Sequence, residues 1–313
     1  MLVIQGAAHM PREARGAVIA IGNFDGVHRG HQALLKAAVE EARKRQTKSG
    51  AMVFEPHPRE HFQPNEPHFH LTPLNEKLRL LRAMGLDLTV VLPFDAALAG
   101  LSAEAFIERV LVAGLGVSHV VIGYDFFFGK GRAGTPETMK AAGAEMGFGV
   151  TVVAPVAEAG EVFSSSAVRL KLAQGDVRGA AHDLGHWWRV AGPVVGGAKR
   201  GTGLGFPTAN VPMPKGTALG HGIYAVRAHV GRENHDAAAY LGTRPTFDDG
   251  KPVLEVFLFD FDGDLYGQEI GVEFIDFIRP DRRFDGIEAL KEQMARDVAK
   301  ARSILATAPK HPA

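Results

Sequence analysis

The sequence predicts an α/β domain with a buried parallel sheet, followed by a small β-barrel that ends in a helix. The first half alternates short, nearly continuous apolar runs with segments of helical periodicity, which indicates a parallel sheet covered by helices. The second half is rich in glycine and proline, and its apolar residues alternate with polar ones, as in short antiparallel strands. The texture changes at residues 183–188, so we expect domains of residues 1–185 and 186–313.

The first half contains five expected strands, each followed by an expected helix. The strands are the apolar runs at residues 17–21, 51–54, 88–92, 117–122 and 150–154. The helices cover residues 31–46, 73–84 and 102–113, a segment from 136 onward, and 166–174. Thr72, Ser102 and Thr135 are the expected N-caps, two of them followed by proline at the first helical position. Gly175 is expected to end the last of these helices.

The second half predicts strands from period-two alternation at residues 223–230, 253–261 and 270–278. A final helix follows, for which Asp285 and Glu288 have the spacing of a capping box. Its apolar stripe consists of Ile287, Leu290, Met294, Val298 and Leu305. The last residues, 306–313, are expected to fray.

Composition narrows the possible classes of function. Of the 313 residues 46% are hydrophobic and 22% charged, and Lys plus Arg equals Asp plus Glu at 35 each. This balance predicts neither nucleic acid nor a membrane as partner, and it leaves homo-oligomerisation open. The chain has no cysteine, which excludes disulfides, thiolate metal sites and cysteine nucleophiles. With no secretory pattern and no apolar run of roughly 20 residues, a cytoplasmic protein is expected.

The segment Gly22–His31 is the first candidate site, because it joins the strand at 17–21 to the next helix. Ligands of parallel α/β sheets bind at the carboxyl ends of the strands. Glycines allow the backbone to approach a ligand closely, and a helix N-terminus presents free N–H groups to phosphate. His28 and His31 are three residues apart at the helix entry and can point the same way. Two imidazoles there can donate hydrogen bonds to phosphate oxygens.

The string Gly-Asn-Phe-Asp-Gly-Val-His-Arg-Gly-His resembles the His-x-Gly-His signature of the nucleotidyltransferase superfamily, and more closely the N-terminal module of bacterial FAD synthetases. These are bifunctional riboflavin kinase/FMN adenylyltransferases. The resemblance implies that the two histidines stabilise the triphosphate of ATP during attack on the α-phosphorus. It also implies ATP contacts for Gly22, Phe24 and Gly30, and flavin contacts for Asn23 and Asp25.

Three later segments of the first half resemble the same family. Phe54-Glu55-Pro56-His57-Pro58 matches the stretch beside the flavin, which implies flavin contacts for Phe54, Pro56, His57 and Pro58. Gly123–Gly129 matches the adenine-binding region, with Asp125 where many relatives carry Asn. Ser164-Ser165-Ser166-Ala167-Val168-Arg169 resembles the Ser-Ser-Thr-x-x-Arg motif, so Ser165, Ser166 and Arg169 are expected to bind the β- and γ-phosphates. Hydroxyls and a guanidinium suit phosphate oxygens.

The second candidate site begins with Gly201-Thr202-Gly203-Leu204-Gly205-Phe206-Pro207-Thr208-Ala209-Asn210. Glycines at 201, 203 and 205 free the backbone to wrap a ligand, here ATP. Thr208 and Asn210 offer neutral oxygens that suit Mg²⁺ bridged to phosphates. The string Gly-Phe-Pro-Thr-Ala-Asn resembles the riboflavin kinase motif, whose Thr and Asn bind the metal.

By this resemblance Glu255 is the base that takes the proton of the riboflavin 5′-hydroxyl, and Arg279 contacts flavin. The whole resemblance extends from about residue 17 to 305. It implies a doubly wound, Rossmann-like nucleotidyltransferase domain and a six-stranded riboflavin kinase barrel. It also implies two ATP sites with Mg²⁺ at each. The expected small-molecule partners are riboflavin, FMN, FAD, ATP, ADP and pyrophosphate.

The chain departs from the family pattern around the second site, with Thr202-Gly203 for Arg-Thr, Tyr240 for Asn and Phe257 for His. The departures at Thr202-Gly203 and Phe257 motivate one alternative, an FMN adenylyltransferase with a weak or inactive kinase. A second alternative is a transferase of the same superfamily that uses CTP or another phosphate acceptor. A third is a flavin or nucleotide sensor without turnover, although such a protein needs no complete set of catalytic residues.

Overall fold

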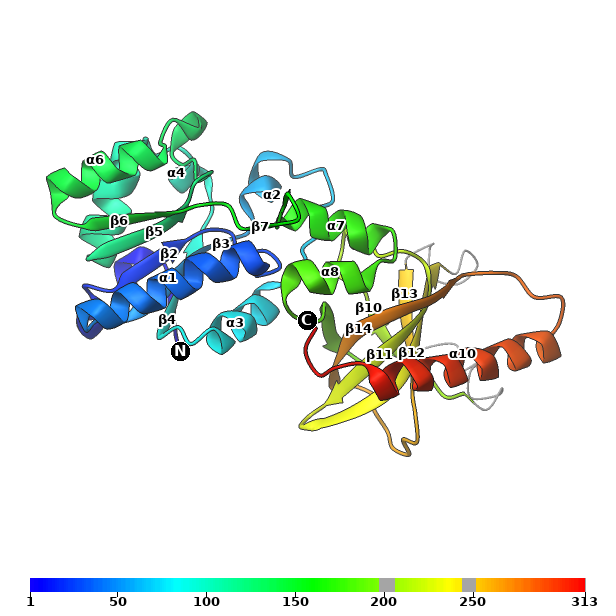
Figure 1. Ribbon diagram of the computed structural model, residues 1–313. Helices are drawn as coiled ribbons and strands as arrows, with labels where there is room; N and C mark the ends of the chain where they lie inside the picture. Colours follow the sequence, from blue (N-terminus) through cyan, green and yellow to red (C-terminus); the bar gives the residue numbers. More distant parts are fainter. Residues whose placement is uncertain (197–205, 244–251, 313) are drawn as a thin grey trace. The chain divides into compact units, whose positions relative to one another are not determined.

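The computed structural model describes residues 1–196, 206–243 and 252–312 (Figure 1). By packing, the chain forms two compact units. The first comprises Met1–His68 and Thr72–Ser164, and the second comprises Phe69–Leu71 and Ser165–Ala313.

A six-stranded parallel sheet forms the centre of the first unit (Figure 1). Its strands in spatial order are β1 (Leu2–Gln5), β4 (Leu88–Pro93), β3 (Ser49–Glu55), β2 (Val18–Ile21), β5 (His119–Gly123) and β6 (Gly149–Val153). The five predicted strands are confirmed. β1 is an additional edge strand, in which Leu2 lies opposite Leu88 of β4. Its apolar run is too short to produce a periodic signal.

The alternation of side chains along β2 shows how this sheet is covered on both faces. Val18 and Ala20 join a core with α1 (Arg29–Arg45) and α3 (Leu74–Ala83), whereas Ile19 and Ile21 join a core on the opposite face. That opposite core is covered by α5 (Ala103–Phe106), its π-helical continuation η3 (Ile107–Leu115) and α6 (Pro136–Met146). Figure 1 shows α1 and α3 on one side of the sheet and α6 on the other. The doubly wound fold is therefore confirmed.

The first unit is completed by short elements. They are the helices α2 (Pro58–Phe62) and α4 (Ala96–Ala99), the turns η1 (Ala7–His9), η2 (Arg12–Ala14) and η4 (Lys130–Arg132), and the hairpin β7 (Ala157–Glu158) and β8 (Glu161–Val162). Two predicted N-caps are confirmed, since Ser102 Oγ accepts a hydrogen bond from the Ala105 N–H and Thr135 Oγ1 one from the Thr138 N–H.

The second unit is a six-stranded antiparallel barrel (Figure 1). Its strands in spatial order are β10 (Ala209–Pro212), β13 (Pro252–Leu258), β12 (Glu233–Thr243), β11 (Gly222–Val230), β14 (Glu269–Pro280) and β9 (Arg189–Pro193). A bridge between Val195 and Asn210 joins the two edges, which nearly closes the barrel. The predicted barrel is confirmed. β9, β10 and β12 were not predicted, since two are short and β12 begins with the polar residues Glu233–Asp236.

The helices α7 (Ser165–Ala173) and α8 (Val177–Leu184) belong to the second unit by packing. Their buried side chains, such as Val168 and Leu184, share one core with Trp188, Tyr224 and Phe274. The packing therefore divides the chain at Ser164. The division at residue 185 remains a prediction about where the two catalytic modules meet. Apolar positions on a helix do not reveal which sheet the helix will cover.

The N-cap of the final helix α10 (Ile287–Thr307) is Gly286, and the helix has no side-chain cap hydrogen bond. The capping box predicted from Asp285 and Glu288 is therefore wrong. The predicted stripe is wrong at its first residue, because Ile287 is 64% exposed. The buried positions of α10 lie in its second half, from Asp297 to Leu305.

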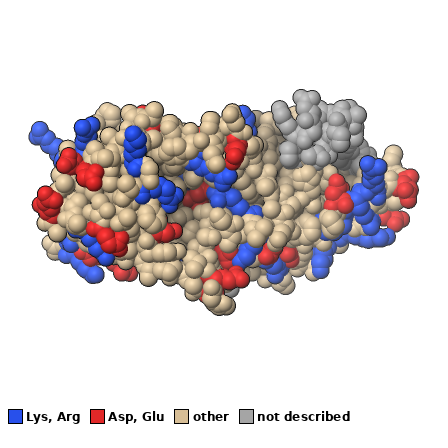
Figure 2. Space-filling view, turned by 90° about the horizontal axis from the view of Figure 1, so that it is seen from above, with Lys and Arg blue, Asp and Glu red and all other residues tan. Residues whose placement is uncertain are grey.

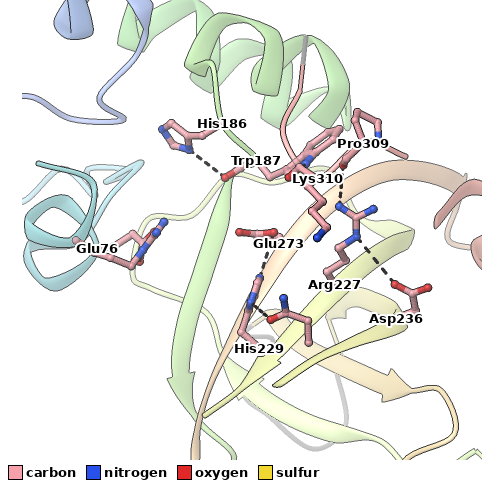
Figure 3. A network of polar contacts seen from close by, with 11 residues as sticks. Glu76, His186, Trp187, Arg227, His229, Asp236, Glu273, Pro309 and Lys310 are labelled. Atoms are coloured by element: carbon pink, nitrogen blue, oxygen red, sulfur yellow. Dashed lines mark hydrogen bonds and ion pairs between the residues drawn. The ribbon is translucent and has the colours of Figure 1, made fainter. Parts of the chain in front are cut away.

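The residues after α10 are bound to the barrel, so the expectation of a frayed tail is wrong for residues 308–310. Arg227 donates hydrogen bonds to the carbonyl oxygens of Ala308 and Pro309, at 2.7 and 2.8 Å. Trp187 Nε1 donates to the carbonyl oxygen of Lys310 at 3.2 Å (Figure 3). All three acceptors are backbone atoms, which leave no trace in the sequence.

Basic and acidic side chains are interspersed over the face of the molecule drawn in Figure 2. Neither kind of charge dominates that face. Among residues 1–196, 206–243 and 252–312, no helix has the length and apolar character needed to cross a membrane.

Candidate functional site

The first candidate site lies where the strand order of the parallel sheet reverses. From β2 the chain moves outward through β3 to β4, and it then returns to β5 on the other side of β2. Loops after β2 and β5 therefore leave adjacent strands and turn in opposite directions. In open α/β sheets the ligand crevice forms at this point, beyond the carboxyl ends of the strands. The topology brings together the Gly22–His31 motif after β2 and the exposed Asp125 after β5.

The loop between β2 and α1 has an unusual backbone. Phe24 and Val27 have φ angles of 48° and 44°, in the left-handed region that β-branched residues such as valine rarely enter. Strain of this kind persists only where the surrounding structure enforces it, and it is concentrated at functional sites.

Asp25 and Thr72 hold this loop in place. Asp25 is 2% exposed, and its Oδ1 accepts hydrogen bonds from Thr72 N at 3.0 Å and Thr72 Oγ1 at 3.3 Å. The Gly26 N–H donates to Thr72 Oγ1 at 2.9 Å. Thr72 was predicted to be the N-cap of α3, and this prediction is wrong. The N-cap is Pro73, and it makes no side-chain cap hydrogen bond. The flavin contact expected of Asp25 stays a prediction beside this structural role.

His28 and His31 lie together at the start of α1. His28 is the N-cap, and its Nδ1 accepts a hydrogen bond from the His31 N–H at 3.4 Å. The two rings stack with centroids 3.6 Å apart, and the ring of Phe24 meets His31 edge-on at 5.3 Å. At Gly30 a Cβ atom would lie 3.1 Å from the His28 ring and 3.3 Å from the Phe163 carbonyl oxygen. Glycine at position 30 thus makes room for the His28 ring. The predicted pair therefore occupies a helix N-terminus, where phosphate binds readily.

His31 is a neutral imidazole at physiological pH. Burial, followed by the neighbouring His28 and Lys77, holds the pKa of His31 well below its usual range. Its Nδ1 is buried and has no hydrogen-bond partner in the part of the chain that the structure describes. A neutral imidazole has one donor and one acceptor nitrogen. His31 can therefore give one hydrogen bond to a phosphate oxygen.

The segment expected beside the flavin follows β3, the neighbour of β2. Phe54 is 8% exposed, and its ring meets that of Phe94 edge-on, with the ring centroids 5.8 Å apart. His57 caps α2, between the half-buried Pro58 and the exposed Pro56. The structure adds Phe62, which is 65% exposed although its ring lies 5.8 Å from that of Phe94. An exposed aromatic ring in such a group was missed, because its exposure is not visible in the sequence.

Ser165, Ser166 and Arg169 lie on α7, in the second compact unit. Ser165 and Ser166 form its first turn, where the helix N-terminus favours anions. Arg169 Nε donates a hydrogen bond to the Phe69 carbonyl oxygen at 2.7 Å. This bond links α7 to the short segment Phe69–Leu71 of the same unit.

Three residues predicted for the second site meet on the barrel. Asn210 of β10 lies directly opposite Glu255 of β13, so both side chains are on the same face of the sheet. Thr208 Oγ1 donates a hydrogen bond to Glu255 Oε2 at 3.5 Å. Asn210 is 6% exposed. The structure thus brings together two neutral oxygen ligands and one carboxylate. Gly201, Gly203 and Gly205, and the departure at Thr202, lie outside the described residues.

The two described departures from the family pattern border Glu255. Tyr240 of β12 lies opposite Glu255 on the other side from Asn210, and its hydroxyl donates to Asp281 at 3.0 Å. Phe257 is two residues further along β13, and its ring contacts that of Phe206 at 5.3 Å. Substitutions scattered along the sequence therefore concentrate around one carboxylate.

Arg279, expected at the flavin, is bound to Asp297 of α10. Its Nε donates to Asp297 Oδ1 at 3.0 Å and its Nη2 to Oδ2 at 2.7 Å. The two side chains are 17% and 7% exposed, and Gln293 donates a further hydrogen bond to Asp297 at 2.8 Å. This pair fastens α10 to β14, and the flavin contact of Arg279 stays a prediction.

We expect Asp297→Ala to destabilise the barrel by about 3 kcal/mol, because it leaves a largely buried guanidinium without its counter-charge. Urea unfolding followed by tryptophan fluorescence measures this, since both tryptophans, Trp187 and Trp188, lie in the second unit. Asp260→Ala, which removes the exposed ion pair with Arg302, is the control and should change stability little. Equal effects of the two changes would contradict the structural role of Asp297.

Comparison with known proteins gives matches along almost the whole chain. The family model described as FAD synthetase matches residues 10–167, and the one described as riboflavin kinase matches residues 184–305. The curated "Bifunctional riboflavin kinase/FMN adenylyltransferase" of Escherichia coli strain K12 is 42% identical over 300 residues, which is 96% of this chain and 95% of that protein. Its counterpart from Bacillus subtilis strain 168 is 36% identical over 299 residues, 94% of each chain.

A solved structure shares the fold. It comes from Streptococcus pneumoniae, is described as a macrolide-efflux protein, and is 29% identical with a TM-score of 0.86. The match covers 96% of this chain and 99% of that one.

Proposed function

Because this chain belongs to the bifunctional riboflavin kinase/FMN adenylyltransferase family, and makes FMN from riboflavin and FAD from FMN, we propose that its two reactions take place at the two sites described above. The adenylyl transfer takes place at the stacked histidines of the first unit. The phosphoryl transfer takes place at the carboxylate of the barrel. The observation that carries this assignment is the convergence of Asn210 and Glu255, on the adjacent strands β10 and β13, with Thr208, which directly precedes β10.

In the adenylyl transfer, an oxygen of the FMN phosphate attacks the α-phosphorus of ATP. The new P–O bond forms as the bond to the β-phosphate breaks, and pyrophosphate leaves. Negative charge grows on the phosphate oxygens during this exchange. Donors fixed in advance at that position stabilise the transition state more than the ground state. His28, His31 and the N-terminus of α1 are suited to this role by their place at the switch point of the sheet. The resemblance implies that Ser165, Ser166 and Arg169 bind the β- and γ-phosphates.

In the phosphoryl transfer, the 5′-hydroxyl of riboflavin attacks the γ-phosphorus of ATP, and ADP leaves. Glu255 accepts the hydroxyl proton as the new bond forms. Its carboxylate lies within reach of the Thr208 hydroxyl, which supports a shared position next to the phosphates.

The residues at this second site fit Mg²⁺. They offer only oxygen donors, which Mg²⁺ prefers, and Mg²⁺ takes its remaining ligands from phosphates and water. Within the described residues no group of three or more His, Cys, Asp or Glu side chains is placed to hold a metal. Thr208 and Asn210 would hold the ion, which when bound would supply positive charge to neutralise the transferred phosphoryl group.

The function is tested by incubating the purified protein with riboflavin, ATP and Mg²⁺ and separating the flavins by chromatography. We expect FMN first and FAD after it, and no product of either kind when a chelator removes the metal. Supplying FMN in place of riboflavin should give FAD directly. If FMN gives FAD while riboflavin gives nothing, then the barrel is not a working kinase, and this result would point to the departures around Thr202 and Phe257.

A further inference from the structure

Lys77 is an exceptional residue of the first unit. Its side chain, on the first turns of α3, is 1% exposed, although lysine is almost never fully buried unless it is paired. Within the described residues its ammonium group forms no hydrogen bond and no ion pair. Asp25, Glu55 and Glu60 act on it only through space. Lys77 lies outside the motifs of both candidate sites.

The surroundings of Lys77 place it at the adenylyl transfer site. Its charge contributes to the lowered pKa of His31, so the two groups are within electrostatic reach of each other. The helix that carries Lys77 is also anchored to the loop that carries the histidines. Thr72, two residues before α3, bonds both Asp25 and Gly26 in that loop.

From these contacts we infer that Lys77 binds a phosphate group of the substrates during adenylyl transfer. The inference rests on the proposed function of the first site. Lysine offers three N–H donors and a full positive charge, and phosphate is the complementary anion at this site. His31 Nδ1 is a buried nitrogen without a partner in the described structure. The two groups come from different helices, His31 from α1 and Lys77 from α3.

Burial supports this reading. It lowers the pKa of Lys77, which shows that the ammonium group has lost much of its hydration. A charge held in this way without a direct partner is costly, and an anionic ligand compensates for it. The competing role is structural, in which Lys77 serves only as the counter-charge of the buried Asp25. Asp25 already accepts two hydrogen bonds from Thr72 and forms no direct ion pair with Lys77.

The test replaces Lys77 by methionine, which keeps the length of the stem and removes the charge. We expect kcat/KM for conversion of FMN to FAD to fall about 10- to 100-fold, while conversion of riboflavin to FMN stays within about twofold. Separate titrations identify the phosphate: a raised KM for FMN points to the flavin phosphate, and a raised KM for ATP to the triphosphate. Lys77→Arg should restore part of the activity. Lys36→Met, at an exposed position of α1, is the matched control and should behave as wild type.

Two results would overturn the inference. One is a Lys77→Met protein that converts FMN to FAD within about threefold of the wild-type rate. The other is recovery of that activity in the double variant Asp25→Asn/Lys77→Met, since the lysine would then act only as a counter-charge. Should Lys77→Met not fold, Lys77→Gln is judged by the same criteria. A wild-type protein unable to make FAD would instead refute the proposed function.

Discussion

Replacing His31 with alanine is expected to abolish FAD formation from FMN while leaving FMN formation from riboflavin largely intact. His31 lies at the N-terminus of α1, stacked on His28, with a nitrogen that has no partner within the described residues. Loss of one fixed donor to a developing phosphate charge lowers kcat by about 10²- to 10³-fold. The measurement is the initial rate of each reaction, followed separately by chromatography with FMN or riboflavin as the starting flavin.

The kinase reaction serves as the internal check on folding in this experiment, because it belongs to the other compact unit. His9→Ala is the matched control, since it removes an exposed histidine of the same unit and should leave both rates unchanged. If His31→Ala loses both activities although the protein remains folded, the two reactions do not have separate sites.

The opposite result is expected for Asn210→Ala. This variant should lose FMN formation but convert FMN to FAD at nearly the wild-type rate. Asn210 lies opposite Glu255 on the barrel and is 6% exposed, so its side-chain oxygen is held in a defined place. Loss of a metal ligand at the transferred phosphate removes several kcal/mol of charge stabilisation. That corresponds to a fall in kinase kcat on the order of 10²- to 10³-fold.

The dependence of both rates on Mg²⁺ concentration sharpens this test. In Asn210→Ala the kinase reaction should need more Mg²⁺, whereas the requirement of the adenylyl transfer should not change. Asn234→Ala, an exposed asparagine of β12 on the same barrel, is the control. An unchanged Mg²⁺ requirement in Asn210→Ala, together with a normal kinase rate, would remove Asn210 from the metal site.

Much of the fold and of both sites was predictable because the relevant signals are local. The segments that form β2 to β6 are nearly continuous apolar runs. Such runs are typical of strands in a parallel sheet that is covered on both faces, so their place in the fold follows from composition. The Gly22–His31 motif could be placed at the carboxyl end of a strand because strand, turn and helix follow directly in the chain. Thr208, Asn210 and Glu255 were predicted as a group by resemblance, and the register of β10 and β13 brings them together.

The rest depended on which partners the elements find in space. Lys77 looks like an ordinary polar position of an amphipathic helix, yet in the folded unit its side chain is 1% exposed. The same holds for Thr72, whose hydroxyl bonds a residue 46 positions away rather than capping its own helix.

The sequence by itself determined most of the order of strands and helices, the motifs of the two sites and the residues proposed to carry the chemistry. These properties depend on side-chain type and on near neighbours in the chain. Only the tertiary structure decided that α7 and α8 cover the barrel core, that residues 308–310 are bound to it, and that Lys77 is buried. Each of these depends on long-range contacts, often to backbone atoms, whose geometry is set by the packing of the whole unit and not by any local pattern.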